Sequence, residues 1–458
     1  MRQDARRHWI FATTALLLTS GLACSVINRD PEQAKTLLAR EVAISWNHLL
    51  LELERYTPGY RPPVSARMYA YVSVAVYEAA LPGLPDYPSL SLRWKALHPA
   101  GLPTWYAGEF VTAAALNRTY AQMARHFFPT APLEWRARID ALAQEHLRKI
   151  EQLADLAAIR STETYADEVS AAVWRWSMTD KIGHDGFLFN YDQNYKAPAC
   201  LGCWQPTGER VMPALLPQWG QVRPFVVLPE AIKARPPLPY DETPASAYYK
   251  QSLEVFTLSQ PRSKENTWIA EFWSDDLPGL TMTPVGRWMS IATQAIECEK
   301  MPVAEMLETY LLCSIALCDA AILCWKLKYQ YQIERPETYI SRVIQKNWQP
   351  LHGTPSFPSY PSGHAMFGAA VAEVLSTQFG EPFAITDRTH EGRDEFQGAP
   401  RHFDSFRAMA RENAFSRLAL GVHYRMDCEE GLRLGEIVGQ KVADLRFETE
   451  KNKNISKR

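Results

Sequence analysis

The sequence predicts an all-α fold. Apolar residues recur at helical spacing along most of the 458 residues. The strict alternation that marks a half-buried strand is almost absent. Several segments also begin with a capping residue followed by proline, which favours a helix start. With 47% apolar and 22% charged residues, the chain has the composition of a globular protein with a sizeable core.

The first helix begins at Asp30-Pro31-Glu32, where an acid follows the cap and the proline, and it continues to about Glu54. Residues 311–325 are apolar enough to suggest a membrane span. However, Asp319 interrupts them, and the mean hydropathy of the chain is -0.27, so we expect a buried core helix. The other helices are expected at residues 64–81, 107–127, 131–154, 161–178, 283–299 and 302–332, from residue 247 onward, and after residue 362.

Residues 183–246 interrupt the helical pattern with many prolines and several aromatics. A stretch this long without regular structure is unusual inside a compact domain. Its aromatic content argues against a flexible linker. We therefore expect a long irregular connection that packs over the helices and forms a rim above a site.

Residues 1–24 have the pattern of an export signal. Arg2, Arg6 and Arg7 precede a short apolar stretch, and small residues precede Cys24. We expect a periplasmic or cell-surface protein. Either the signal is cleaved after Ala23 in the ordinary way, or the protein is a lipoprotein whose only membrane anchor is a lipid on Cys24. Residues 448–458 form a charged tail.

The formal net charge of -2, with no long run of one sign, argues against a nucleic-acid partner. Seven of the eight cysteines follow Cys24. Cys200 and Cys203 are close enough in an exported chain to close a local disulfide. The remaining thiols include at least one that is free or bonded to another chain, and we expect three of them to be buried packing residues: Cys313, Cys318 and Cys324.

Three blocks in the last third of the chain carry candidate chemistry. In the first, Lys328 and Arg335 are seven residues apart, so both can face the same side of a helix. Pro336 disfavours helix at Arg335 and places that residue at the helix end, near a cleft. Taken alone, this block is better explained by a solvated basic face.

In the second block, Ser362, Gly363 and His364 precede an apolar run rich in Ala and Gly. They are therefore expected at a helix N-terminus, where free N–H groups and the helix dipole favour an anion. Gly363 allows the backbone to approach that anion, and His364 is placed to exchange protons with it. The alternative is that Ser362 only caps the helix.

In the third block, His423 and Asp427 are one helical turn apart. The carboxylate can hold one ring nitrogen and leave the other free to attack or to ligate. Arg417 adds a fork that can bind an oxyanion. The alternative is a buried histidine with a structural role.

Together the blocks read Lys-x6-Arg-Pro, Pro-Ser-Gly-His and Ser-Arg-x5-His-x3-Asp. This order resembles the superfamily of vanadium-dependent haloperoxidases and type 2 phosphatidic acid phosphatases, and it covers residues 328–427. Trp325 and Phe357 are similar to the residues that wall the pocket in the chloroperoxidase branch. The chain departs from that branch at Gln332, Ile333 and Glu334, which puts the halide preference in doubt. An acid beside Arg335 would also weaken oxyanion binding.

The resemblance implies two helical bundles, here residues 25–260 and 261–447, with the site in the second. It implies vanadate on Nε2 of His423, for which phosphate can substitute, with Asp427 orienting that ring. His364 would exchange protons and Lys328 would polarise the peroxide that oxidises halide. The other residues implied to hold the oxyanion are Arg335, Arg417, Ser362 and Gly363.

Two alternatives remain open. The first is an exported acid phosphatase, in which His423 attacks a phosphate ester to form a phosphohistidine and His364 protonates the leaving group. The second is a helical surface lipoprotein that binds a ligand and has lost catalysis.

Overall fold

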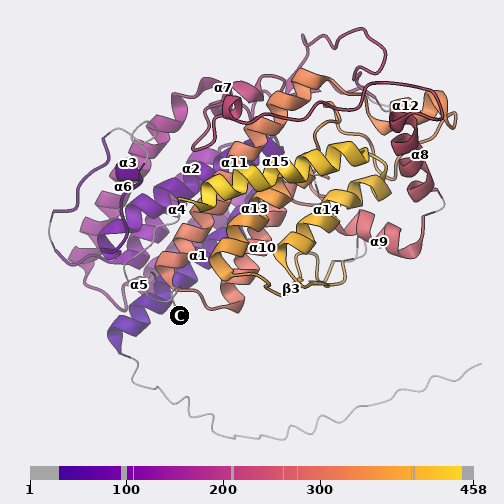
Figure 1. The fold of residues 1–458 in the computed structure, drawn as a ribbon. Coiled ribbons are helices and arrows are strands. Elements are labelled where there is room, and N and C mark those ends of the chain that lie inside the picture. Colours follow the sequence, from indigo (N-terminus) through magenta and orange to yellow (C-terminus); the bar gives the residue numbers. More distant parts are fainter. Residues whose placement is uncertain are drawn as a thin grey trace, which may run out of the picture.

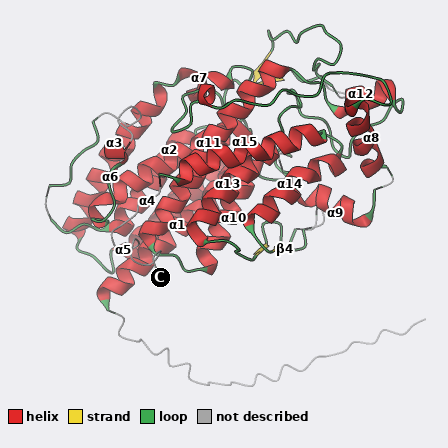
Figure 2. Cartoon of the chain, viewed as in Figure 1, coloured by secondary structure: helices red, strands yellow, loops and turns green. Residues whose placement is uncertain are grey.

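The computed structural model describes residues 30–93, 101–106, 108–207, 211–260, 262–275, 277–393, 395 and 398–445. Helix makes up 61% of the protein and strand 3%, which confirms the all-α prediction (Figure 2). The expected export signal, Cys24 and the tail 448–458 lie outside the described residues.

The N-terminal helices gather on one side of the molecule (Figure 1). The first begins as predicted, with the Asp30 side chain accepting a hydrogen bond from the backbone N–H of Glu32. The fourth helix begins later than the pattern suggested, at Thr112. The elements are α1 (Pro31–Tyr56), α2 (Pro62–Ala80), η1 (Leu81–Gly83), α3 (Leu90–Arg93), α4 (Thr112–Phe127), α5 (Leu133–Ile150), α6 (Leu156–Met178) and α7 (Lys181–His184).

The C-terminal helices form the second group, and the long helix α11 lies between the two groups (Figure 1). α11 packs against α2 on one side and against α13 and α15 on the other. These elements are α8 (Ala247–Ser259), α9 (Lys264–Phe272), α10 (Pro284–Cys298), α11 (Val303–Tyr331), α12 (Pro336–Val343), α13 (Gly363–Phe379), α14 (Phe406–Leu420) and α15 (Arg425–Ala443).

Helix α11 is long and apolar enough to cross a membrane by length and composition, yet its apolar window is completely buried in the protein. This is the core helix that the sequence predicted. One hydrophobic core runs from Leu38 to Ala443 and includes both groups of helices. The domain boundary after residue 260 stays a prediction.

Close packing of α13 on α15 depends on three glycines that face α13. A Cβ atom on Gly431, Gly435 or Gly439 would come within 2.7, 2.3 and 2.4 Å of a backbone oxygen of the α13 segment. Their spacing of four residues puts all three on one face of α15. The two backbones therefore approach closely enough to bring the start of α15 beside the start of α13.

The proline-rich connection packs over α11, as predicted. Asp319 of α11 accepts hydrogen bonds from the backbone N–H groups of Phe225, Val226 and Val227, at 2.7, 2.8 and 2.7 Å. The short elements of the proline-rich connection are β1 (Tyr191–Asp192), β2 (Ala214–Leu215), η2 (Trp219–Gln221) and η3 (Pro229–Ala231), and β1 pairs with β2 in antiparallel fashion. A second antiparallel pair, β3 (Ile385–Asp387) and β4 (Arg401–Phe403), lies before α14.

The cysteine predictions are confirmed within the described part of the chain. Cys200 and Cys203 form a disulfide. The three cysteines of α11 are buried free thiols: Cys313, Cys318 and Cys324.

Candidate active site

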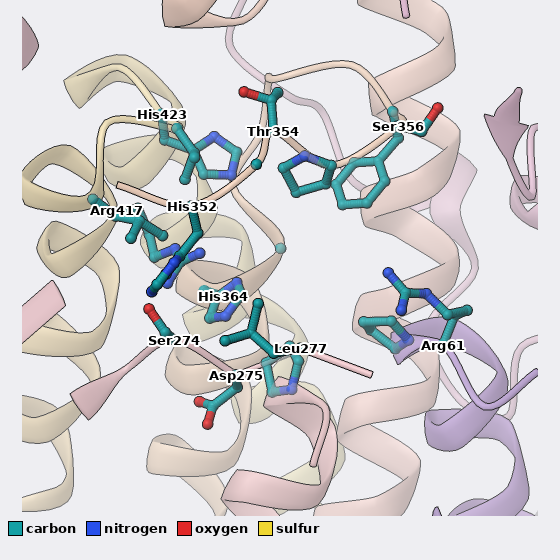
Figure 3. Close-up of a pocket in the computed structure, with 18 of the residues that line it drawn as sticks. Arg61, Ser274, Asp275, Leu277, His352, Thr354, Ser356, His364, Arg417 and His423 are labelled. Carbon is teal, nitrogen blue, oxygen red and sulfur yellow. The ribbon is translucent and has the colours of Figure 1, made fainter. Parts of the chain in front are cut away.

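A cavity of about 300 Å³ opens where α11, the N-terminus of α13 and the turn between α14 and α15 converge (Figure 3). It brings together residues from all three sequence blocks. The predicted residues in its wall are Trp325, Phe357, Gly363, His364, Arg417 and His423. The remaining predicted residues, Lys328, Arg335, Ser362 and Asp427, are fully buried behind that wall.

His423 is held in one tautomer. Its Nδ1 lies 2.9 Å from Oδ2 of Asp427, and its Nε2 lies 3.2 Å from Nη1 of Arg335. A guanidinium has no acceptor atom, so Nε2 of His423 accepts and Nδ1 carries the proton that is donated to Asp427. The arrangement leaves the Nε2 lone pair on the cavity side as the basic atom of the ring.

Asp427 is itself held by three groups. Its Oδ2 accepts hydrogen bonds from Oγ of Ser359 at 2.5 Å and from the backbone N–H of Tyr424 at 3.1 Å, besides the contact to His423. Burial raises the pKa of Asp427 to about 6, against the lowering effect of the Ser359 hydrogen bond. Ser359 lies within the second sequence block, but its neighbours in sequence give no sign that it contacts Asp427.

Arg335 occupies the N-cap position of α12, and its side chain points back into the protein. Its Nε donates to the carbonyl oxygen of Phe357 at 2.9 Å and its Nη1 to that of Val422 at 2.8 Å. Its Nη2 is buried with no hydrogen-bond partner among the described residues. Burial lowers the pKa of Arg335 to about 10, so it stays a cation at neutral pH. The protein therefore fixes Nε and Nη1 of the Arg335 guanidinium, and Nη2 remains to donate to a ligand.

Lys328 has its ammonium group committed to a loop. Its Nζ donates to the carbonyl oxygens of Pro358, Ser359 and Pro361 at 3.0, 2.8 and 2.6 Å. Because an ammonium has three N–H donors, the loop uses all of them. Burial lowers the pKa of the Lys328 amine, and the charge of Arg335 acts in the same direction. A bound oxyanion would have to share one of these hydrogens.

The N-terminus of α13 supplies backbone donors, as predicted. Oγ of Ser362 accepts from the backbone N–H of Ala365 at 3.4 Å, so it does cap the helix, and its own hydrogen remains to be donated. A Cβ atom at Gly363 would lie 3.5 Å from the ring of Phe367, which is an ordinary van der Waals contact. The close approach of an anion to this backbone therefore stays a prediction.

His364 lies on the cavity wall with its Nε2 buried and without a hydrogen-bond partner among the described residues (Figure 3). Burial, followed by the charges of Arg417 and Lys328, holds its pKa well below the ordinary value. Burial, followed by the charges of Arg335 and Lys328, likewise holds the pKa of His423 well below its ordinary value. Both imidazoles are therefore neutral at neutral pH and able to accept a proton or a ligand.

Several known proteins are similar to this chain in sequence or fold. A family model described as the VCPO second helical-bundle domain matches residues 342–449. Vanadium chloroperoxidase of Curvularia inaequalis is 28% identical over 32% of this chain and 34% of its own length. The vanadium-dependent bromoperoxidase of Ascophyllum nodosum is 37% identical over 23% of this chain and 20% of its own length. The chain thus matches about a third and a fifth of these two curated relatives.

The likeness to solved structures extends further. A structure described as the first bacterial vanadium-dependent iodoperoxidase superposes with a TM-score of 0.77 at 27% identity, covering 88% of this chain and 96% of that one. A bacterial vanadium-dependent chloroperoxidase in its holo form superposes at 0.62 with 16% identity, over 83% and 92% of the two chains, and shows the fold alone.

This chain is similar to the vanadium-dependent haloperoxidases in its family-model match, its curated relatives and its fold. The superfamily motifs quoted above supply the residues that surround its cavity.

Two aromatic rings wall the haloperoxidase-like cavity, where the resemblance placed them. Trp325 and Phe357 have ring centroids 5.0 Å apart. The proline-rich connection fixes the indole, because Nε1 of Trp325 donates to the carbonyl oxygen of Leu215 at 3.2 Å. The same connection contributes three residues to the cavity lining, which confirms the predicted rim: Tyr191, Thr207 and Met212.

Glu334 is not among the residues that line the cavity. Its two carboxylate oxygens accept from Nη2 and Nη1 of Arg342 at 2.9 and 3.2 Å. The side chain of Glu334 is 1% exposed. Because Arg342 balances its charge, Glu334 does not act as the unpaired acid beside Arg335 that the sequence suggested.

Three charged or titratable residues of the lining were not predicted from the motifs: Arg61, Asp275 and His352 (Figure 3). The carboxylate of Asp275 lies 3.6 Å from Nη1 of Arg287 and 3.7 Å from Nε2 of His390. The residue before His352 is fixed to the end of α14, because the backbone N–H of Leu351 donates to the carbonyl oxygen of Leu420. Long-range packing brings these residues to the site, and no local pattern distinguishes them.

The residues present fit a tetrahedral oxyanion. Nη2 of Arg335 is a buried donor behind the wall, and Arg417 lies at the wall with its Nη1 fixed on the carbonyl oxygen of Trp273 at 2.7 Å. His423 provides a single neutral nitrogen whose lone pair accepts a hydrogen bond from Arg335, and an oxyanion bonded there would take the place of that hydrogen bond. Such a set can neutralise a multiply charged anion and bond to it once.

Proposed function

We propose that this protein is a vanadium-dependent haloperoxidase that oxidises halide with hydrogen peroxide. One observation carries the proposal: Nε2 of His423 is held as an acceptor at the wall of a cavity that Arg417 and His364 also line. The likeness to a bacterial iodoperoxidase over 96% of its length supports the same activity.

The cofactor implied by the relatives is vanadate, for which phosphate is a close substitute. When bound, vanadate supplies Lewis acidity that activates peroxide while the metal keeps its oxidation state. His423 Nε2 would be its protein ligand. Arg335, Arg417 and Lys328 would neutralise its charge, and the hydroxyl of Ser362 and the N–H of Gly363 would donate hydrogen bonds.

His364 carries the proton exchange in this proposal. The overall reaction consumes one halide, one hydrogen peroxide and one proton, and it releases one hypohalous acid and one water. A neutral imidazole can take a proton from the entering peroxide at Nε2 and return it to the departing oxygen. The depressed pKa of His364 keeps that nitrogen unprotonated before the peroxide enters.

Asp427 and Ser359 keep His423 in the tautomer that this chemistry needs. Trp325 and Phe357 cover one wall of the cavity with apolar surface. Water is less stable against such a wall, and charged groups there interact more strongly than in solvent. The protein therefore contributes orientation, proton exchange and a partly dry cavity.

We also propose that the protein is exported. The closed Cys200–Cys203 disulfide supports this proposal, because disulfides persist in oxidising compartments. Lipidation at Cys24 is the finer part of the proposal, and labelling with a radioactive fatty acid would test it.

The central experiment uses the chain from residue 25 loaded with orthovanadate. Chloride, bromide and iodide oxidation by peroxide is assayed beside hydrolysis of a generic phosphate ester by the vanadate-free protein. The variant His423→Ala is compared with His402→Ala, which removes an exposed histidine on β4. We expect vanadate-dependent halide oxidation that His423→Ala abolishes and His402→Ala retains.

Other outcomes would overturn the proposal. Ester hydrolysis that vanadate inhibits, with no halide oxidation, would make the protein a phosphatase that uses the same pocket. A folded protein that binds vanadate but shows neither activity would favour the hypothesis of a non-catalytic binding protein.

A further inference from the structure

The disulfide loop 200–204 contacts the segment that carries Arg335. Gln332, Ile333 and Glu334 connect α11 to α12, and Arg335 follows directly. The backbone N–H of Trp204 donates to the carbonyl oxygen of Gln332 at 2.7 Å, and that of Glu334 donates to the carbonyl oxygen of Gly202 at 3.0 Å. Cys203 and Ile333 are therefore paired as an antiparallel bridge.

The opposite side of this segment contacts the candidate active site. The backbone N–H of Ser359 donates to the carbonyl oxygen of Ile333 at 2.9 Å. Ser359 is also the residue whose hydroxyl holds Asp427. Residues 332–334 thus lie between the disulfide loop and the groups that orient His423.

The segment has a backbone conformation that depends on its surroundings. Gln332 ends α11 with φ 55, in the left-handed region that residues with a side chain rarely adopt. Its Nε2 donates to the carbonyl oxygen of Tyr329 at 2.7 Å and also bonds the hydroxyl of Tyr195. Such conformations persist where neighbouring contacts hold them.

Gly202 in turn has little freedom within the disulfide loop. Its φ of +78 is a glycine conformation, and a Cβ atom there would lie 2.6 Å from the ring of Tyr240. Trp204 is buried and packs against the rings of Tyr195 and Tyr329. The carbonyl of Gly202 and the N–H of Trp204 are therefore presented to residues 332–334 in fixed directions.

We propose that the Cys200–Cys203 disulfide loop is a positioning element for Arg335. The closed loop holds residues 332–334 and thereby the direction in which the Arg335 guanidinium enters the cavity wall. Opening the disulfide frees the four-residue turn, loosens this attachment and weakens oxyanion binding. Thiol reductants then lower the affinity of the pocket without touching any group in it.

This inference rests on the proposed function only in taking vanadate as the natural oxyanion. Inorganic phosphate probes the same donors. The test therefore measures binding of phosphate and vanadate by calorimetry, with no halide or peroxide present, so its outcome does not depend on whether the protein oxidises halide.

The primary variant is the double substitution Cys200→Ser/Cys203→Ser. We expect its dissociation constants for phosphate and vanadate to rise about tenfold, as is usual when a group supporting a ligand residue is lost. Helical circular dichroism should be unchanged. Cys298→Ser removes an exposed free thiol at the end of α10 and should leave both constants unchanged.

A reductant provides a second measurement that needs no variant. Phosphate is the probe here, because thiols reduce vanadate. Dithiothreitol should weaken phosphate binding to the wild-type protein by the same factor and have no effect on the double cysteine variant. This arm decides the matter if the variant fails to fold.

A double-mutant cycle with Arg335→Ala separates positioning from general loosening. If the loop acts through Arg335, opening the disulfide in the Arg335→Ala background causes no further loss of affinity. Unchanged phosphate affinity on reduction would overturn the proposal, and so would an equal further loss in the Arg335→Ala background.

Discussion

Ser359 donates a hydrogen bond to Oδ2 of Asp427 at 2.5 Å, and the same Oδ2 lies 2.9 Å from Nδ1 of His423. The hydroxyl therefore supports the carboxylate that fixes the histidine tautomer. Ser359 and Asp427 are 68 positions apart in the sequence. The packing of α15 against α13 brings them together.

Ser359→Ala should weaken vanadate binding by about tenfold, because it removes a group that supports the residue orienting the proposed ligand His423. The hydrogen bond from Ser359 also lowers the pKa of Asp427, so its loss should raise that pKa further above its present value of about 6. Calorimetry from pH 5 to 8 measures both effects, and the loss of affinity should be largest just above pH 6, where Asp427 is ionised in the wild-type protein and still protonated in the variant.

Ser341→Ala is the matched control for this change. Ser341 also donates a partly buried hydrogen bond, to the carbonyl oxygen of Trp348 at 2.8 Å, but it does not line the cavity. Equal losses of affinity in the two variants would contradict a specific role for Ser359.

Arg335→Lys should lower oxyanion affinity by at least about tenfold, although the charge is retained. Arg335 reaches the carbonyl oxygens of Phe357 and Val422 with two separate nitrogens of a planar fork, and the single nitrogen of a lysine cannot reproduce that spread while it also faces a ligand. The measurement is phosphate and vanadate affinity. Arg342→Lys, at the other end of α12, is the control, and a substitution at Arg335 that keeps full affinity would show that only charge matters there.

Gly435→Ala should destabilise the protein by about 1–3 kcal/mol, because it forces a methyl group into the α13–α15 interface. The added Cβ would lie 2.3 Å from the carbonyl oxygen of Met366, so the two backbones must separate. Urea unfolding measures the change. Gly353→Ala has open space around its Cβ and should leave stability nearly unaltered.

Because α13 carries Gly363 and His364 while α15 carries Asp427, Gly435→Ala should also weaken phosphate binding. Reduced stability with unchanged affinity would show that the site tolerates a shift of α15.

The free energy of unfolding should fall as the pH rises from about 4.5 to 7. Burial raises the pKa of Glu54 from its ordinary value of 4.5 to about 7. The folded state then binds this proton more tightly than the unfolded state, so stability is greatest below the unfolded pKa and is lost up to the folded one. The shift corresponds to about 3 kcal/mol at most.

Glu54→Gln should flatten this dependence, as measured by urea unfolding at pH 5 and pH 8. Burial raises the pKa of Glu78 to about 7 as well, so part of the dependence should remain in the variant. Glu52→Gln, on the same helix but half-exposed, should keep the wild-type dependence. An unaltered slope in Glu54→Gln would show that Glu54 is ionised in the folded protein at pH 5.

The sequence by itself determined the helical class, several helix starts and the candidate residues of the site. Caps and prolines are local signals, so they located α1, α10 and α11 correctly. The three motifs named the residues that surround or support the cavity, from Lys328 to Asp427. They did so because the superfamily pattern assigns each residue type to a fixed order along the chain.

The tertiary structure decided how these residues are used. It showed that Lys328 holds a loop through three carbonyl oxygens, that Glu334 pairs with Arg342, and that Ser359 supports Asp427. It also brought Asp275 and His352 to the cavity. Hydrogen-bond partners separated by tens of residues depend on how helices pack, and periodicity within one helix carries no information about the helix it will contact.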